Sequence, residues 1–337
     1  MASTNGSSLL EINSLRTYFF TEDGVVPAVD GIDLRIQRGQ TVGLVGESGC
    51  GKSVTSLSVM RLISPPGRIV EGEMIFDGVD LAKVPEERMF GVRGNRISMI
   101  FQEPMTSLNP VFRIGDQIGE ALLVHRKTDP GHVRQKVIDA LSLVGIPQPD
   151  LRYQSYPHEM SGGMRQRVMI AMALATQPEL LIADEPTTAL DVTIQAQILE
   201  LIRDLKDKIN MAVLLITHDL GVIAEMAEVV AVMYAGKIVE RADVVTLFKQ
   251  PKHPYTQGLL FSIPTLETRK EKRLNVISGT VPNLLRLPHG CRFAPRCPHA
   301  MPKCRVDTPA LSRNGESQVA CWLYDTTVSE TGEPNGR

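Results

Sequence analysis

One short motif limits most strongly what this chain can fold into. Residues 46–53 read Gly-Glu-Ser-Gly-Cys-Gly-Lys-Ser and fit the pattern Gly-x4-Gly-Lys-Ser/Thr. An apolar, β-branched run at residues 41–45 precedes the motif, and apolar residues at helical spacing follow it over residues 53–63. The glycines let backbone N–H groups turn toward phosphate oxygens, and the N-terminus of the following helix adds positive charge. The sequence therefore predicts a phosphate-binding loop between a strand and a helix.

The residues of this loop have separate expected roles. Lys52 supplies positive charge for the β- and γ-phosphates of a nucleotide, and Ser53 offers a hydroxyl to Mg²⁺. The remaining nucleotide contacts are expected from Gly46, Ser48, Gly49, Cys50, Gly51 and Val54. The alternative is a structural glycine-rich turn that binds nothing, and the Lys-Ser pair between strand and helix disfavours it.

A second strand is predicted to end in two carboxylates. Residues 180–183 are all apolar, and Asp184 and Glu185 follow them directly. At the C-terminal edge of the strand, Asp184 would hold Mg²⁺ directly or through water. Glu185 is placed to orient and polarise a water for attack on the γ-phosphate. A solvated acidic turn is the alternative, which the phosphate loop elsewhere in the chain disfavours.

Strands and helices alternate along the chain. Further strands are expected at residues 97–101 and 213–217, and an amphipathic helix at residues 193–209. This alternation predicts an α/β fold with a mostly parallel sheet that is covered on both faces. Helices expected at residues 114–124 and 132–144 interrupt the alternation, and we interpret them as a helical insertion.

Composition argues against several classes of protein. The 36 Lys and Arg residues nearly balance the 38 Asp and Glu residues, so bulk charge does not favour binding to nucleic acid or to an anionic membrane. No apolar run approaches the roughly 18–20 residues that a membrane span needs. Residues 1–8 are small and polar, unlike a secretory signal. We therefore expect an intracellular protein whose membrane role, if it has one, comes through a partner.

A third motif precedes the acidic strand. Residues 160–167 read Met-Ser-Gly-Gly-Met-Arg-Gln-Arg and closely resemble the signature motif of ATP-binding cassette (ABC) ATPases. Ser161 can cap the helix that follows, and Gly162 and Gly163 leave its first amides open to a phosphate. Such a segment alone would be only a flexible cap, but its position here is the one that the family requires. Met164 departs from the family, which usually has Gln at this place.

Other landmarks of the ABC family occur in the expected order. Gln102 resembles the Q-loop glutamine, which contacts Mg²⁺ and faces the membrane partner. Asp191 ends a segment that resembles the D-loop, and His218 resembles the switch histidine that senses the γ-phosphate. The resemblance thus implies that Glu185, His218 and Gln102 are catalytic. Phe19 resembles the aromatic residue that stacks on adenine, with packing in the core as the open alternative.

The resemblance covers about residues 8–260 and implies a P-loop NTPase (RecA-like) core with an N-terminal antiparallel β subdomain. We expect an ABC ATPase domain at residues 8–262, including a helical subdomain at about residues 103–165. A small irregular cysteine-rich domain is expected at residues 263–328, with a flexible tail at residues 329–337. The resemblance also implies that two cassettes share each ATP, which lies between the phosphate loop of one and the signature motif of the other.

Longer segments resemble the bacterial dipeptide/oligopeptide and nickel importer ATPases, most closely the first ATPase subunit of dipeptide permeases. These segments are residues 101–110, 183–197 and 253–260. The resemblance implies a peripheral protein at the cytoplasmic face of the bacterial inner membrane, paired with a second ATPase subunit beneath two transmembrane permease subunits. A peptide-binding protein delivers the substrate in such systems, and no nucleic-acid partner is expected.

Three alternatives to peptide import stay open at this point. One is the ATPase of a nickel or other small-solute importer of the same family. Another is a soluble ABC ATPase of DNA repair or translation, although the chain has neither a long coiled-coil insertion nor a second cassette. A regulatory subunit that binds ATP without hydrolysing it is the third, and Glu185 and His218 argue against it.

Four of the five cysteines gather near the C-terminus: Cys291, Cys297, Cys304 and Cys321. They could be reduced, unrelated thiols, but four thiolates also match a [4Fe–4S] cluster or a tetrahedral Zn²⁺ site. Structural zinc favours close Cys-x2–4-Cys pairs, and this segment has none. The wide spacing, the Cys297-Pro298 pair and the similar segments of some dipeptide importers favour the cluster, with zinc as the alternative. Its role would be structural or redox-sensing.

Overall fold

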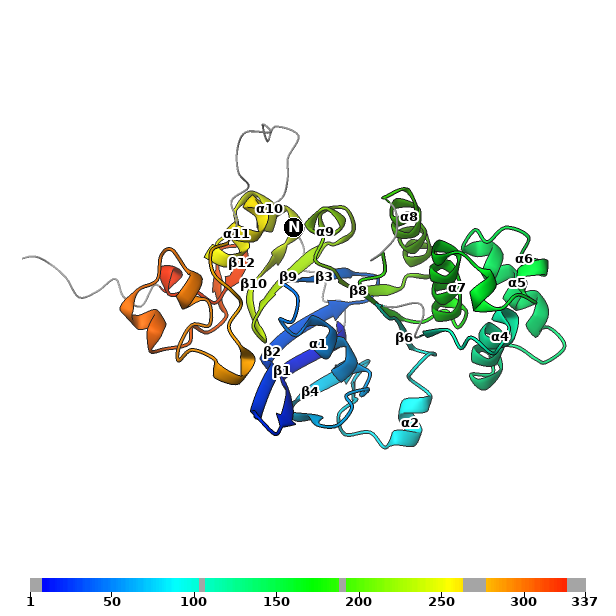
Figure 1. Ribbon diagram of the computed structural model, residues 1–337, viewed down its shortest axis with the longest axis horizontal. Coiled ribbons are helices and arrows are strands. Elements are labelled where there is room, and N and C mark those ends of the chain that lie inside the picture. The colour runs from blue at the N-terminus through cyan, green and yellow to red at the C-terminus, as the bar shows by residue number, and fades with distance from the viewer. Residues whose placement is uncertain (1–7, 103–106, 188–191, 263–276, 326–337) are drawn as a thin grey trace, which may run out of the picture.

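The computed structural model describes residues 8–102, 107–187, 192–262 and 277–325. Two β-sheets form the centre of this described part of the protein (Figure 1). The main sheet has the strand order β11-β12-β10-β9-β3-β8-β7-β6, and the smaller sheet has the order β2-β1-β4-β5. The strands are β1 (Ser8–Thr21), β2 (Gly24–Gln37), β3 (Thr41–Val45), β4 (Gly67–Phe76), β5 (Val79–Asp80), β6 (Ile97–Ile100), β7 (Leu180–Asp184), β8 (Ala212–Ile216), β9 (Val229–Tyr234), β10 (Lys237–Asp243), β11 (Ser312–Asn314) and β12 (Ser317–Val319).

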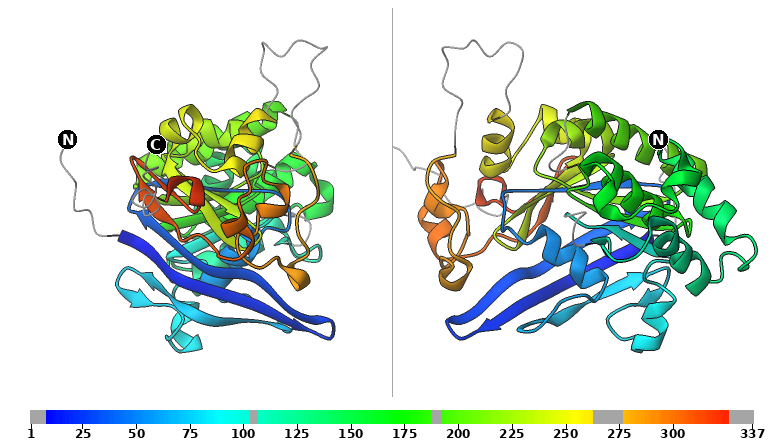
Figure 2. Two further views of the ribbon diagram at one scale, coloured as in Figure 1. Left: turned by 90° about the vertical axis from the view of Figure 1, so that its left-hand side faces the viewer. Right: turned by 45° about the vertical axis from the view of Figure 1, so that its right-hand side comes forward.

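The strands β9, β3, β8, β7 and β6 run parallel and are almost entirely buried. Their side chains alternate between two hydrophobic clusters, because successive residues of a strand point to opposite faces. In β8, Val213 and Leu215 join the helices, whereas Leu214 and Ile216 join the antiparallel sheet and α1. Figure 2 shows the antiparallel sheet as a separate layer beneath the main sheet. Burial on both faces explains why these strands read as continuous apolar runs.

Helices surround the parallel strands and form a group of their own beyond β6 (Figure 1). Among the described residues none of them is long and apolar enough to cross a membrane. The helices are α1 (Lys52–Val59), α2 (Glu86–Phe90), α4 (Ile114–Val124), α5 (Val133–Leu143), α6 (Pro149–Arg152), α7 (Gly162–Leu174), α8 (Val192–Ile209), α9 (Leu220–Met226), α10 (Val244–Lys249) and α11 (Pro254–Phe261).

The fold class predicted from the sequence is confirmed. The parallel core, the antiparallel N-terminal sheet and the helical group of α4 to α7 are all present. The C-terminal segment, whose described residues are 277–325, differs from the expectation in one respect, because its hairpin β11–β12 extends the main sheet. β12 pairs with β10 at Glu240 and Val319. The cysteine-rich segment is therefore joined to the ATPase core, while the proposed domain boundaries stay predictions.

Candidate active site

The phosphate loop lies where the sequence predicts it, between β3 and α1. Its backbone passes so close to neighbouring strands that two positions require glycine. A Cβ on Gly46 would lie 2.1 Å from the carbonyl oxygen of Met233, and one on Gly51 would lie 2.2 Å from that of Ala28. Gly51 also has a φ of 109°, in the left-handed region that favours glycine. The motif's spacing is thus enforced by the packing of the loop against β2 and β9.

Lys52 is folded across this loop. Its side chain is 6% exposed, and Nζ donates hydrogen bonds to the carbonyl oxygens of Gly46 at 2.8 Å and Glu47 at 3.1 Å. The ammonium group is therefore fixed beside the loop amides, where a phosphate would lie. Ser48 and Gly49 are exposed at the loop's tip, and Ser53 and Val54 are half-buried in the first turn of α1. Cys50 instead packs into the core, and burial raises the pKa of its thiol.

Asp184 has the features of a cation ligand. It is 4% exposed at the end of β7, where the nearby Ser53 hydroxyl partly offsets the effect of burial on the pKa of its carboxyl. Burial raises the pKa of its carboxyl, and its Oδ1 is buried with no hydrogen-bond partner. A buried, unpartnered carboxylate oxygen is costly unless something positive approaches it. Asp184 and Ser53, both oxygen donors, thus fit the Mg²⁺ that the sequence predicts.

Glu185 lies at the centre of a second cluster. Gln102 Nε2 donates to its Oε2 at 2.9 Å, and His218 Nδ1 lies 3.2 Å from its Oε1. The backbone of Glu185 has a φ of 48°, which is uncommon for a residue with a side chain. Its N–H donates to the carbonyl oxygen of Ile216 at 2.8 Å, which holds this conformation. Strained backbone of this kind is typical of functional sites.

Sheet topology explains why these three residues meet. The strands β6, β7 and β8 are neighbours and run parallel, so their C-terminal ends lie at one edge of the sheet. Gln102, Glu185 and His218 each follow the end of one of these strands within two residues. Ligands of open α/β sheets bind outside the C-terminal ends of the strands.

The signature motif opens helix α7. Ser161 Oγ accepts a hydrogen bond from the Met164 N–H at 3.3 Å, so Ser161 caps the helix as expected. Gly162 and Gly163 form the first turn, and Gln166 donates to the carbonyl oxygen of Pro186, close to Glu185. Figure 1 shows α7 well apart from α1. The motif's contact with ATP therefore stays a prediction, which would need a second cassette.

For two other expected residues the expected role stays a prediction. The Phe19 ring packs over Gly67, where an added Cβ would lie 2.6 Å from its Cε1. Phe19 is half-buried, and both the adenine contact and the packing alternative stay open. Asp191, with the rest of the D-loop segment, lies outside the described residues.

The four C-terminal cysteines line one small cavity of about 10 Å³. Burial raises the pKa of the thiols of Cys291 and Cys297, and that of Cys321 to about 11. Within the ranges that the structure describes, no group of three or more His, Cys, Asp or Glu side chains is arranged to hold a metal ion. The thiols thus share a location, but the structure does not support the metal site expected from the sequence.

Sequence reasoning missed three residues at the phosphate loop, one inside the loop and two that contact it. Glu47 pairs with Arg296 through both carboxylate oxygens, at 2.6 and 3.1 Å. The Glu47 N–H also donates to the Tyr255 hydroxyl at 2.9 Å. The available signal was Glu47 itself, because an acidic side chain inside an anion-binding loop needs a cationic partner.

Two family models match this chain. The model described as "ABC transporter" matches residues 29–188, which include the phosphate loop, the signature motif and the acidic strand. The model described as "Oligopeptide/dipeptide transporter, C-terminal region" matches residues 239–304, which include three of the four clustered cysteines.

Relatives in Bacillus subtilis (strain 168) match almost the whole chain. The oligopeptide transport ATP-binding protein AppD is 54% identical over 96% of this chain and 99% of its own length. The oligopeptide transport ATP-binding protein OppD is 54% identical over 97% of this chain and 92% of its length. The dipeptide transport ATP-binding protein DppD is 51% identical over 94% of this chain and 95% of its length.

Solved structures agree on the fold. A dimeric post-hydrolysis state of the ATP-binding cassette MJ0796 bound to ADP and Pi has a TM-score of 0.64 at 23% identity, covering 70% of this chain and 98% of its own. CbiO1 from Clostridium perfringens has a TM-score of 0.61 at 24% identity, covering 72% and 91%. This chain is an ABC-type ATPase and belongs to the family of ATP-binding subunits of oligopeptide/dipeptide ABC transporters.

Proposed function

We propose that this chain hydrolyses ATP at the edge formed by β6, β7 and β8, and that this hydrolysis powers peptide import. The observation that carries the proposal is the convergence of Gln102 and His218 on the two carboxylate oxygens of Glu185. A carboxylate held from both sides is oriented before the substrate arrives, and such positioning is the main contribution of an ATPase to phosphoryl transfer.

The other residues supply charge and position. Lys52 and the loop amides bind the β- and γ-phosphates, and Glu185 accepts the proton of the attacking water. Ser53, Asp184 and Gln102 would hold Mg²⁺, which neutralises phosphate charge when it is bound. His218 keeps Glu185 oriented and senses the γ-phosphate.

The proposed partners are supported by the relatives, which are named as oligopeptide or dipeptide transport ATP-binding proteins. We propose that this chain pairs with a second ATPase subunit, so that Ser161, Gly162 and Gly163 complete the partner's nucleotide site. The pair would bind two permease subunits at the cytoplasmic face of the membrane, and a binding protein would deliver the peptide. The D-loop residue Asp191 would lie at the contact between the two cassettes.

Glu185→Gln tests the catalytic role. The amide keeps the shape of the side chain but cannot accept the proton, so turnover should fall about a thousandfold, equivalent to about 4 kcal/mol. ATP binding should persist, and trapped ATP should stabilise the paired cassettes. The measurement is phosphate release by the assembled complex; turnover within about twofold of wild type would exclude Glu185 as the base.

We also propose that Cys291, Cys297, Cys304 and Cys321 bind a [4Fe–4S] cluster, with zinc as the alternative. The support is their chemistry and their shared cavity. Binding would require rearrangement of the thiols described above. Because the raised pKa values of the Cys291, Cys297 and Cys321 thiols favour their protonated forms, binding would also release protons.

Metal analysis of anaerobically purified protein tests this second proposal. The cluster predicts iron and acid-labile sulfide with broad visible absorbance, lost in Cys297→Ser but retained in Cys50→Ser. Colourless protein with one zinc would assign the site to zinc, and metal-free protein that binds ATP normally would remove both.

A further inference from the structure

The phosphate loop is held by residues from the far end of the chain. Glu47 is the second residue of the loop, and its carboxylate forms a two-pronged ion pair with Arg296. The Arg296 side chain is 5% exposed and that of Glu47 is 28% exposed, so water screens the pair only partly. Two parallel N–H···O bonds also fix the orientation of both groups.

A second contact holds the backbone of the same residue. The Tyr255 hydroxyl accepts the Glu47 N–H at 2.9 Å, and the carbonyl oxygen of Glu47 accepts from Lys52 Nζ at 3.1 Å. Tyr255 itself is fixed, because its ring is fully buried between Tyr234 and Phe293 at centroid distances of 4.6 and 5.5 Å. The side chain of Glu47 is therefore held by Arg296 of the C-terminal segment, and its backbone is held by Tyr255 of α11.

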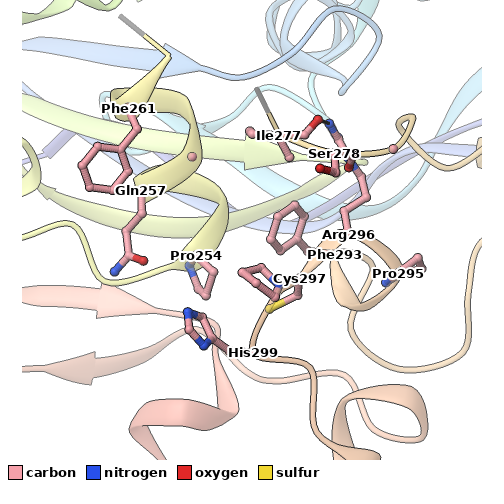
Figure 3. Close-up of a pocket in the computed structure, with 13 residues that line it drawn as sticks. Pro254, Gln257, Phe261, Ile277, Ser278, Phe293, Pro295, Arg296, Cys297 and His299 are labelled. Atoms are coloured by element: carbon pink, nitrogen blue, oxygen red, sulfur yellow. Dashed lines mark hydrogen bonds between the residues drawn. The ribbon is translucent and has the colours of Figure 1, made fainter. Parts of the chain in front are cut away.

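Arg296 is anchored on its other side as well. It donates to the carbonyl oxygens of Ser278 at 3.1 Å and Ile277 at 3.3 Å, and to the Tyr234 hydroxyl at 3.4 Å. Figure 3 shows Arg296 beside Ile277 and Ser278 in the wall of a cavity of about 560 Å³. A guanidinium held by these partners cannot follow Glu47 if the loop moves, so it restrains the loop.

We infer that Arg296 is a positioning residue of the nucleotide site, acting through Glu47. The loop amides beside Glu47 are those that should receive phosphate oxygens, and an unneutralised carboxylate there would repel them. Arg296 cancels this charge and holds the first turn of the loop. The inference rests on the proposed nucleotide site and adds the C-terminal segment to it. The inference makes ATP affinity depend on a segment that lies outside every ATP motif.

Substitutions that replace each charged residue of the ion pair with an uncharged one test the inference. Arg296→Gln leaves Glu47 unneutralised and should weaken binding of a fluorescent ATP analogue to the full chain about tenfold. Glu47→Gln combined with Arg296→Gln removes the repelling charge and should restore affinity to within about threefold of wild type. Arg296→Lys keeps the charge without the two-pronged contact and should be intermediate. Arg305→Gln is the matched control, because Arg305 is exposed in the same segment.

The outcomes separate the two proposals. If Arg296→Gln binds within about twofold of wild type, Arg296 does not position the loop. If the double variant binds as weakly as Arg296→Gln, Arg296 supports only the folding of the segment, and the inference is wrong. If Arg296→Gln does not fold, Arg296→Lys decides, since unchanged affinity overturns the inference. Unchanged binding by Lys52→Ala would instead overturn the proposed nucleotide site itself.

Discussion

Two regions of the molecule differ in the side chains that they bring together. Polar side chains converge at the C-terminal ends of β6, β7 and β8, and aromatic rings pack together at the junction between the main sheet and the C-terminal segment. Glu185 has a positive φ, and the buried Oδ1 of Asp184 has no hydrogen-bond partner. At the junction, Tyr234, Tyr255 and Phe293 are at most 2% exposed and pack with centroid distances of 4.6 to 5.5 Å. The first region therefore lowers the stability of the folded state, and the second region raises it.

This contrast teaches that the two regions should respond oppositely to substitution. At the catalytic edge, removing charge should change chemistry and leave stability unchanged or higher, because a strained or desolvated group is relieved. At the junction, removing a ring should lower stability, because a cavity replaces close packing. The phosphate loop is linked to both regions: the charge of Lys52 partly offsets the rise that burial causes in the pKa of the Asp184 carboxyl, and the Glu47 N–H donates to the Tyr255 hydroxyl.

Phe293→Ala should give the largest loss of stability. The ring is 2% exposed and contacts Tyr234, Tyr255 and His253, so its loss should cost about 3–5 kcal/mol. Thermal unfolding should begin roughly 6–10 °C lower, as measured by calorimetry. Phe293→Leu keeps much of the volume and should lose less than half as much. A melting temperature equal to wild type would mean that the junction does not stabilise the fold.

Lys52→Ala should have the next largest effect, on binding and not on stability. Removing the cation that faces the phosphates should weaken ATP binding about a hundredfold, or about 2.7 kcal/mol. Titration of the full chain with a fluorescent ATP analogue measures the affinity. Lys249→Ala removes an exposed lysine from α10 and is the matched control. If both variants bind equally well, the loop's positive charge lies elsewhere.

The regions also differ in how much of them could be predicted from the sequence. The parallel strands and the catalytic residues follow from local patterns, because apolar runs ending in polar residues meet at one edge of a parallel sheet. Asp184 and Glu185 were found in this way, whereas Gln102 and His218 were identified by their resemblance to family landmarks. The Glu47–Arg296 pair joins residues 249 positions apart, and no periodicity connects them. Pairing between loops depends on tertiary packing, which single-sequence patterns do not encode.

Asp184→Asn should stabilise the nucleotide-free chain while weakening Mg²⁺–ATP binding. Burial raises the pKa of Asp184, so folding favours its protonated form, and this stabilisation is lost as pH rises through the folded-state pKa. Asn stays uncharged and avoids that loss, so it should raise the free energy of unfolding by about 1 kcal/mol at neutral pH. Calorimetry from neutral to acidic pH should show the gain vanish once wild-type Asp184 is protonated in both states. Exposed Asp207→Asn on α8 should show no gain at any pH.

Cys50→Ser should have the smallest effect. It tests whether position 50 of the phosphate loop contributes to packing or to catalysis. The thiol is 1% exposed in the core that β1, β2 and β4 form with the main sheet, and Lys52 Nζ lies 3.8 Å from its sulfur. The loop needs a backbone N–H at this position and no thiol chemistry, so turnover should stay within about twofold of wild type. A hydroxyl in this apolar place should cost at most about 1 kcal/mol of stability, and Cys50→Ala should cost a similar amount through lost packing. Parallel measurement of phosphate release and thermal unfolding separates the effects. Loss of turnover in Cys50→Ser at an unchanged melting temperature would mean that the sulfur contributes directly to the nucleotide site. Residues of the same loop would then differ in role, some serving packing and others catalysis.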